Sequence, residues 1–340
     1  MIGSTKPILL TGIQPTNRLT LGNYLGVIKK IINEQDNYDC YLFAADWHSV
    51  TIPLSLQEAS YKKIDEYKWN VIRMYAACGL DPTKNKVFIQ SEIKEHLELF
   101  YFLLTHSTLG ELQRMTQYKH LSKQFVLPNG TEMALVGLLT YPVLMAADIL
   151  MYDTDYVVLG EDQTQHLELT IDLAERINNK YKVNLFKKPK AFNPKGNKAG
   201  IKIKDLQNPE IKMSKSSKSY EGVIFLDDDL ETIREKIMKA KTDSIGKINI
   251  DPINQPGITN LLEIYASLTN ISIEEACDRL QSDTYRELKE VVAELVIKEI
   301  SEIQDRYEQI NLEVLKEAIE KNNRHCRAKA REKLAQLKEL

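Results

Sequence analysis

The sequence has few cysteines, little net charge and no long apolar run. Its four cysteines, among 340 residues, lie far apart and form no CxxC pair, which argues for reduced thiols and against a structural metal. The net charge of -3 does not favour a polyanion partner, so any nucleic-acid surface has to be local. No segment approaches the roughly 18 apolar residues of a membrane span. The N-terminal stretch is too weakly apolar for a signal peptide, so we expect a cytoplasmic protein that does not contact a membrane.

Short β-type runs alternate with helical patterns in the first part of the chain. Composition, at 43% apolar and 27% charged, is that of a globular protein, and the length allows two domains. The alternation is typical of the α/β class with a doubly wound parallel sheet, in which ligands bind at the carboxyl ends of the strands. The expected strands are residues 6–12, 39–46, 86–91 and 155–160.

Composition changes over residues 187–222 to lysine, asparagine, glycine and proline, which predicts a long mobile connection. After it the pattern is helical nearly to the end. We therefore expect a Rossmann-like domain over 1–205, a mobile loop over 206–220 and an all-α domain over 221–340 whose last helix packs back on the first domain.

Two short segments are candidates for phosphate binding. In TLGN, Thr20 to Asn23, a glycine allows close approach of a ligand and free amides at a helix start favour anions. A turn that tolerates glycine explains the same residues. In IKMSKSS, Lys212 and Lys215 stand three residues apart in a loop, where flexible cations can neutralise a triphosphate. The alternative here is a solvated linker.

A third segment, YPVLMAADILMYDTD from residue 141, is apolar with one acid in its middle. Helical spacing puts Tyr141, Met145 and Asp148 on one face. Burying a carboxylate costs several kcal/mol unless it is paired. Asp148 therefore has either a partner within the fold, such as an arginine, or a donor from a ligand.

Three segments in this order, TLGN, GEDQ (160–163) and KMSKS (212–216), resemble the class I aminoacyl-tRNA synthetases. The finer pattern GIQPT..LTLGNYLG, YPVLMAADIL and GEDQTQH is similar to the bacterial-type tryptophanyl-tRNA synthetases. The resemblance runs through the whole chain. Thr20 and Asn23 stand where the class I pattern usually has histidines, as in the tryptophanyl variant.

The resemblance implies a tryptophan pocket in which Asp148 accepts the indole N–H and Met145 packs on the ring, since a thioether packs well against aromatic groups. The sister tyrosyl enzymes favour glutamine at the Met145 position, so methionine favours tryptophan. Tyr141, Gln163 and Gln14 are expected at the substrate ammonium and carboxylate. The tryptophan-binding set that the resemblance implies is Gly12, His48, Tyr141, Met145, Asp148 and Gln163.

For ATP the resemblance implies a cradle at TLGN and cations from the lysine loop. A substrate carboxylate attacks the α-phosphate without a general base, so positioning and charge decide the rate. The implied catalytic residues are Thr20, Asn23, Lys212 and Lys215, and the implied ATP-binding residues are Gln14, Thr20, Gly22, Asn23, Gly160, Asp162, Lys212, Met213, Ser214 and Lys215. Lys119 is a further candidate for a triphosphate contact.

The implied reaction is activation of tryptophan with ATP, with Mg²⁺ carried by the nucleotide, followed by transfer to tRNA(Trp). The helical domain would then bind the anticodon. The segment from Leu315 to Leu340 contains eight Lys or Arg and four Glu, an excess of positive charge that suits either an RNA contact or a solvated helix. The apolar run from His96 suits core or a homodimer interface, and family members are homodimers. Alternatives are a tyrosine-specific sister enzyme, a non-catalytic tRNA- or tryptophan-binding paralogue, and a small-molecule adenylyltransferase.

Overall fold

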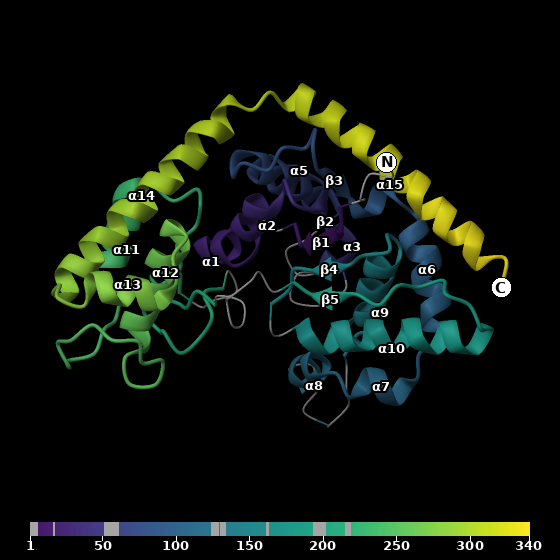
Figure 1. The fold of residues 1–340 in the computed structure, drawn as a ribbon, viewed down its shortest axis with the longest axis horizontal. Coiled ribbons are helices and arrows are strands. Elements are labelled where there is room, and N and C mark those ends of the chain that lie inside the picture. Colours follow the sequence, from purple (N-terminus) through teal and green to yellow (C-terminus); the bar gives the residue numbers. More distant parts are fainter. Residues whose placement is uncertain are drawn as a thin grey trace.

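A parallel sheet of five strands, in the order β3-β2-β1-β4-β5, forms the centre of the first part of the chain (Figure 1). The computed structural model describes residues 6–15, 18–50, 61–123, 129, 134–160, 163–192, 202–214 and 219–340. The predicted α/β class and parallel sheet are confirmed. The four expected strands are present, and the fifth, β5, is a two-residue strand at Lys190–Ala191 that the sequence analysis missed.

The elements of the first part of the chain are β1 (Ile8–Ile13), α1 (Leu21–Asn23), the π-helical segment η1 (Tyr24–Ile28), α2 (Lys29–Glu34), β2 (Asp39–Ala44), α3 (Asp46–Ser49), α5 (Tyr61–Ala77), β3 (Lys86–Ile89), the 3₁₀ segment η2 (Gln90–Glu92), α6 (Glu95–Leu104), α7 (Leu109–Gln113), α8 (Thr116–Ser122), α9 (Val136–Leu150), β4 (Tyr156–Val157), α10 (Thr164–Tyr181) and β5. The second part contains α11 (Leu230–Met238), α12 (Pro256–Thr269), α13 (Ile273–Leu280), α14 (Tyr285–Gln309) and α15 (Leu312–Leu337).

Both faces of the sheet are covered, as the near-continuous apolar runs of its strands require. Successive residues of β1 enter different hydrophobic clusters: Leu9 packs in the cluster that includes α5, whereas Leu10 packs in the cluster that includes α6, α9 and α10. The same alternation in β2 sends Leu42 to the first cluster and Phe43 to the second. The first cluster continues into α11, α12 and α14, so the helical part shares a core with one face of the sheet.

Residues 187–222 are packed in their described parts, in contrast to the long mobile connection predicted from composition. Ile203, Leu206 and Met213 are buried. Ile203 and Met213 belong to one small hairpin. In it Met213 N donates to Ile203 O, and the backbones of Lys204 and Lys212 form an antiparallel β-bridge. Asn260 of α12 holds this hairpin, because its side chain both accepts from Lys204 N and donates to Lys204 O. Lysine-rich composition here does not imply a solvated chain.

The last helix, α15, runs back along the first part of the chain and packs against β3 and α6 (Figure 1). Its side chains complete the edge of the sheet: Asn323 Oδ1 accepts from Ile89 N, and Asn322 Nδ2 donates to Asn85 O. Within the described residues no helix has both the length and the hydropathy that a membrane span needs. All four cysteines are free thiols.

Candidate active site

A cavity of about 390 Å³ opens at the carboxyl ends of β1 and β4. The strand order reverses between these two strands, and the crevice at such a reversal is where doubly wound sheets bind their ligands. Most of the residues that the sequence analysis selected meet there. They are Gly12, Gln14, Asn23, His48, Tyr141, Met145, Asp148, Gly160, Gln163 and Lys212.

Helix α9 brings Tyr141, Met145 and Asp148 to this cavity together, as their spacing predicts. Gly12 forms part of the floor, where a Cβ atom would lie 2.4 Å from the ring of Phe43. Any side chain at Gly12 would therefore displace an aromatic ring of the core.

Other selected residues lie elsewhere in the described part of the chain. Thr20 is buried and caps α1, and Met213 is buried beside Gly22. Ser214 and the exposed Lys119 are not among the residues that line the cavity. Asp162 and Lys215 lie outside the described residues, so their roles stay predictions.

Asp148 receives its hydrogen bonds from the fold itself. It is 1% exposed, and three side chains surround its carboxylate. Gln90 Nε2 donates to both oxygens at 2.8 and 2.9 Å, His96 Nδ1 lies 2.5 Å from Oδ1, and His48 Nε2 lies 2.9 Å from Oδ2. The arginine partner considered for this acid is wrong: two histidines and an amide take that place.

These contacts fix the charge of Asp148. Burial by itself raises the pKa of a carboxyl group, but hydrogen bonds from His48 and His96 outweigh it and hold the pKa of Asp148 below its ordinary value. The group is therefore an anion at neutral pH. Of its three donors, His48 is the one that also lines the cavity.

A second polar group surrounds Tyr141. Its hydroxyl group donates to Gln117 Oε1 and lies 3.1 Å from His166 Nε2, while His166 Nδ1 lies 2.6 Å from Gln163 Oε1. His166 is 1% exposed. The chain of contacts fixes the orientation of Tyr141 and Gln163 at the wall of the cavity.

The TLGN segment forms a capping box. Thr20 Oγ1 accepts from Asn23 N at 3.2 Å, and Asn23 Oδ1 accepts from Thr20 N at 3.1 Å. Capping of this kind satisfies amides at the start of a helix and fixes the angle at which the chain enters it. The helix continues through the π-helical segment η1, and such segments are frequent at functional sites. Asn23 is held at the cavity by this local geometry.

Four residues of these networks were missed from the sequence. Gln90 and His96 follow β3 in the segment QSEIKEH. This segment is a polar stretch at the carboxyl end of a strand, the same feature that marks the other expected ligand-binding segments. His166 ends the quoted segment GEDQTQH but was not assigned a role. Gln117 gives no comparable signal, because helical spacing alone does not bring it to the cavity.

The site is suited to polar recognition and charge stabilisation. It brings together a buried anion, the lysine side chain of Lys212 and several amides around an opening that can hold a small molecule. In the described part of the chain no group of three or more His, Cys, Asp or Glu side chains is arranged to hold a metal ion. The sheet, the cavity at its reversal point and the helical part define an α/β nucleotide-binding enzyme of the Rossmann type.

Comparison with known proteins gives the family. The chain belongs to the class I tRNA synthetases, in the group for W and Y, whose family model matches residues 4–301. A tryptophan–tRNA ligase of Malacoplasma penetrans is 45% identical over 319 residues, which cover 94% of this chain and 92% of that protein. A tryptophan–tRNA ligase of Listeria monocytogenes is 43% identical over 302 residues, with 89% and 87% covered.

Solved structures agree with this assignment. The crystal structure of a tryptophanyl-tRNA synthetase from Mycoplasma pneumoniae matches with a TM-score of 0.87 and 38% identity, covering 97% of this chain and 96% of that one. A tryptophanyl-tRNA synthetase from Campylobacter jejuni, complexed with ADP and tryptophane, matches with a TM-score of 0.75 and 28% identity, covering 98% of each chain. A tyrosyl-tRNA synthetase from Archaeoglobus fulgidus, at 20% identity, shares the fold.

Proposed function

We propose that this protein is a tryptophan–tRNA ligase, which activates tryptophan with ATP and transfers it to the 3′ end of tRNA(Trp). The observation that carries the proposal is the meeting of Met145, Asp148 and Lys212 in one cavity. In this cavity an apolar side chain and a buried anion are suited to an indole ring, and the lysine is suited to phosphates. The relatives named above carry this activity in their names.

Tryptophan would enter with its indole N–H toward Asp148 and its ring against Met145. An ionised carboxylate offers about four acceptor positions, and the two bonds from Gln90 with one from each histidine already use them. An arriving indole therefore has to take the place of one donor or lie beside it. His48 is the donor that the indole would displace, since it lines the cavity whereas Gln90 and His96 do not.

ATP would occupy the side of the cavity formed by Asn23, Gly160 and Lys212. The tryptophan carboxylate attacks the α-phosphate, a new C–O–P bond forms, and the bond to the β-phosphate breaks so that pyrophosphate leaves with its negative charge. Lys212 would stabilise that charge, together with Lys215 as the resemblance implies. In the second step a hydroxyl group at the tRNA 3′ end attacks the aminoacyl carbonyl carbon, an ester bond forms, and the bond to the phosphate breaks so that AMP leaves.

Mg²⁺ enters this proposal as the counter-ion of the ATP phosphates. Asp148 is the one carboxylate among the described residues that line the cavity, and two histidines already contact it. The described residues therefore supply a cation to the phosphates and leave metal coordination to the nucleotide. The helical part, residues 221–340, is the proposed anticodon-binding region, with the α/β domain over 1–205 and the lysine loop over 206–220. The cytoplasm is the proposed location.

A homodimer is part of the same proposal. Tyr101 on α6, Leu109 on α7 and Val136 on α9 are 68%, 62% and 72% exposed, and α9 contacts both α6 and α7. The opposite face of α6 carries Leu99 and Leu103 into the core. The apolar run from His96 is thus divided between core and surface, and the surface half is suited to a second copy of the chain.

The tyrosine-specific alternative is favoured less by the composition of the cavity. A phenol hydroxyl group needs polar partners, whereas the neighbours of Asp148 along α9 that line the cavity, Met145 and Ile149, are apolar. The non-catalytic paralogue is disfavoured because Lys212 is held at the cavity by a hairpin, a placement that a binding-only protein does not require.

The test is amino-acid-dependent ATP–pyrophosphate exchange by the purified protein without tRNA, with tryptophan and tyrosine compared. We expect exchange with tryptophan and its loss in Asp148→Ala. Asp172→Ala is the control, because Asp172 is an exposed carboxylate on α10 that does not line the cavity. Exchange with tyrosine would show the specificity of the tyrosyl sister enzymes, and no exchange with any amino acid would contradict catalysis.

A further inference from the structure

The start of the TLGN segment pairs with a strand-like segment some two hundred residues later in the chain. Leu21 N donates to Ile224 O, Leu226 N donates to Leu19 O, both at 2.9 Å, and Thr20 forms an antiparallel bridge with Phe225. Residues 223–226 follow the lysine loop closely in sequence. The TLGN segment is therefore joined through its backbone to the segment that follows the lysine loop.

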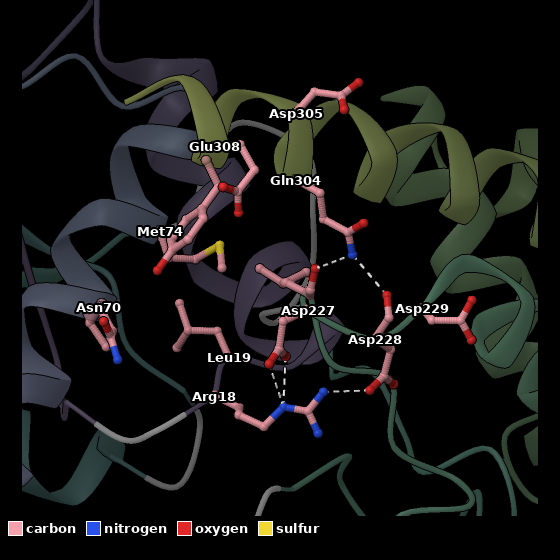
Figure 2. Close-up of a pocket in the computed structure, with 13 residues that line it drawn as sticks. Arg18, Leu19, Asn70, Met74, Asp227, Asp228, Asp229, Gln304, Asp305 and Glu308 are labelled. Carbon is pink, nitrogen blue, oxygen red and sulfur yellow. Dashed lines mark hydrogen bonds and ion pairs between the residues drawn. The ribbon is translucent and has the colours of Figure 1, made fainter. Parts of the chain in front are cut away.

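Arg18 strengthens this junction with its side chain. Its Nε atom lies 2.7 Å from Asp227 Oδ2, its Nη2 atom lies 2.6 Å from Asp228 Oδ1, and its guanidinium carbon lies 3.9 Å from the centre of the Phe225 ring. Figure 2 shows the guanidinium between the two carboxylates. An arginine fork that meets two acids and an aromatic face at once has one fixed orientation.

The acids that hold Arg18 are themselves fixed. Asp228 is 8% exposed, and its Oδ2 atom accepts from Lys236 of α11 at 2.7 Å and from Phe225 N at 3.1 Å. Gln304 of α14 donates to the carbonyl groups of Leu226 and Asp228, at 2.9 and 2.8 Å (Figure 2). The helical part thus fixes the positions of Asp227 and Asp228. Arg18, which binds both acids, in turn fixes the position of the TLGN segment that follows it.

The acidic side chains around Arg18 make its positive charge important for this junction. Arg18 lines a cavity of about 650 Å³ together with Asp227, Asp228, Asp229, Asp305 and Glu308. Among the described residues around this cavity Arg18 supplies the positive charge. Without Arg18, Asp227 would lose its ion pair and Asp228 would keep only that with Lys236, and the two neighbouring carboxylates would repel each other more strongly.

We propose that Arg18 is a positioning residue for ATP, which fixes the TLGN segment against the segment that follows the lysine loop. The inference rests on the proposed function and adds a residue that does not itself line the nucleotide cavity. Arg18 acts through Leu19 and Thr20, whose backbone it anchors, and so sets the place of Asn23 at the cavity. Binding of tryptophan, on the α9 side, does not depend on this junction.

The experiment compares Arg18→Met, Arg18→Lys and Arg73→Met in ATP–pyrophosphate exchange, with ATP and tryptophan varied separately. Arg73 is the matched control because it also stacks on an aromatic ring, that of Tyr307 at 3.9 Å, and donates to Tyr307 O, without touching residues 18–23. We expect Arg18→Met to raise KM for ATP about tenfold and to lower kcat, with KM for tryptophan changed less than about twofold, because a misplacement of about 1 Å can cost up to about 100-fold. Arg18→Lys should recover part of the loss, and Arg73→Met should leave both KM values unchanged.

An unchanged KM for ATP in Arg18→Met, or an equal rise in both KM values, would overturn the proposal. Direct binding of ATP by calorimetry, for wild type and variants, separates it from the proposed function: a wild type that binds ATP but shows no exchange refutes the ligase, while the variants still decide the role of Arg18. If Arg18→Met does not fold, Asp227→Asn replaces it, because the Asp227 side chain is 50% exposed and tolerates the change. A smaller rise in KM for ATP is then expected, and none would refute the proposal.

Discussion

His96 Nδ1 lies 2.5 Å from Oδ1 of Asp148, and the opposite ring nitrogen of His96 lies 2.7 Å from the Tyr152 hydroxyl group. All three side chains are at most 1% exposed. Because the carboxylate accepts, Nδ1 carries the proton, and in the neutral ring Nε2 then accepts from Tyr152. The buried contacts from Tyr152 to His96 and from His96 to Asp148 therefore fix the orientation of Asp148, the acid that contacts tryptophan in our proposal.

Replacing His96 by leucine should weaken tryptophan binding. The change removes one donor from a buried carboxylate, and an unsatisfied buried group costs about 1–3 kcal/mol. We expect KM for tryptophan in pyrophosphate exchange to rise by about tenfold, with KM for ATP unchanged. The thermal midpoint should fall at the same time, because the cost is present in the free protein as well.

Tyr152→Phe is the matched control for this prediction. It keeps the bond from His96 to Asp148 and removes only the hydroxyl group beyond it. A smaller effect on KM than that of His96→Leu is expected. Equal effects of the two variants would mean that the histidine acts through packing rather than through its donor.

The sequence predicted the position of this site better than its contacts. The parallel sheet and the strand ends followed from the alternation of β-type and helical patterns, and the spacing of Tyr141, Met145 and Asp148 correctly placed them together. The donors to Asp148 come from segments 52 to 100 residues away along the chain. Periodicity describes one element at a time, so it does not identify partners that only the packing of several elements brings together.

The basic residues of α15 show the same limit. Their excess was attributed to RNA contact or solvation, but several of them hold the helix on the first domain. Lys333 is buried and pairs with Asp153, Arg331 pairs with Glu95, and Lys338 pairs with Glu98. The acidic partners are distant in sequence, so the count of charges within the helix could not reveal them.

Asn323 should be essential to the docking of α15. Its side-chain oxygen accepts from Ile89 N on the edge strand β3, and Asn323→Leu would leave that buried amide without a partner. We expect the free energy of unfolding to fall by about 1–3 kcal/mol, measured by urea denaturation. Arg324→Leu is the neighbouring control: Arg324 is exposed and pairs within its own helix, so its loss should change stability by no more than about 0.5 kcal/mol. Equal losses would contradict the role of the amide.

Glu263, on α12, should give the protein a stability that depends on pH. Burial raises the pKa of this carboxyl group from 4.5 to about 7, and the charge of Lys204 only partly opposes the shift. Between these values the unfolded chain releases the proton that the folded chain keeps, so stability falls as pH rises from 4.5 to 7 and is constant above. Glu263→Gln should remove that slope: the stability curves of wild type and variant should run parallel below pH 4.5 and diverge up to pH 7, with the variant gaining at most about 3 kcal/mol. Urea denaturation across this range measures the difference, and curves that stay parallel throughout would show that Glu263 titrates as a solvated carboxylate.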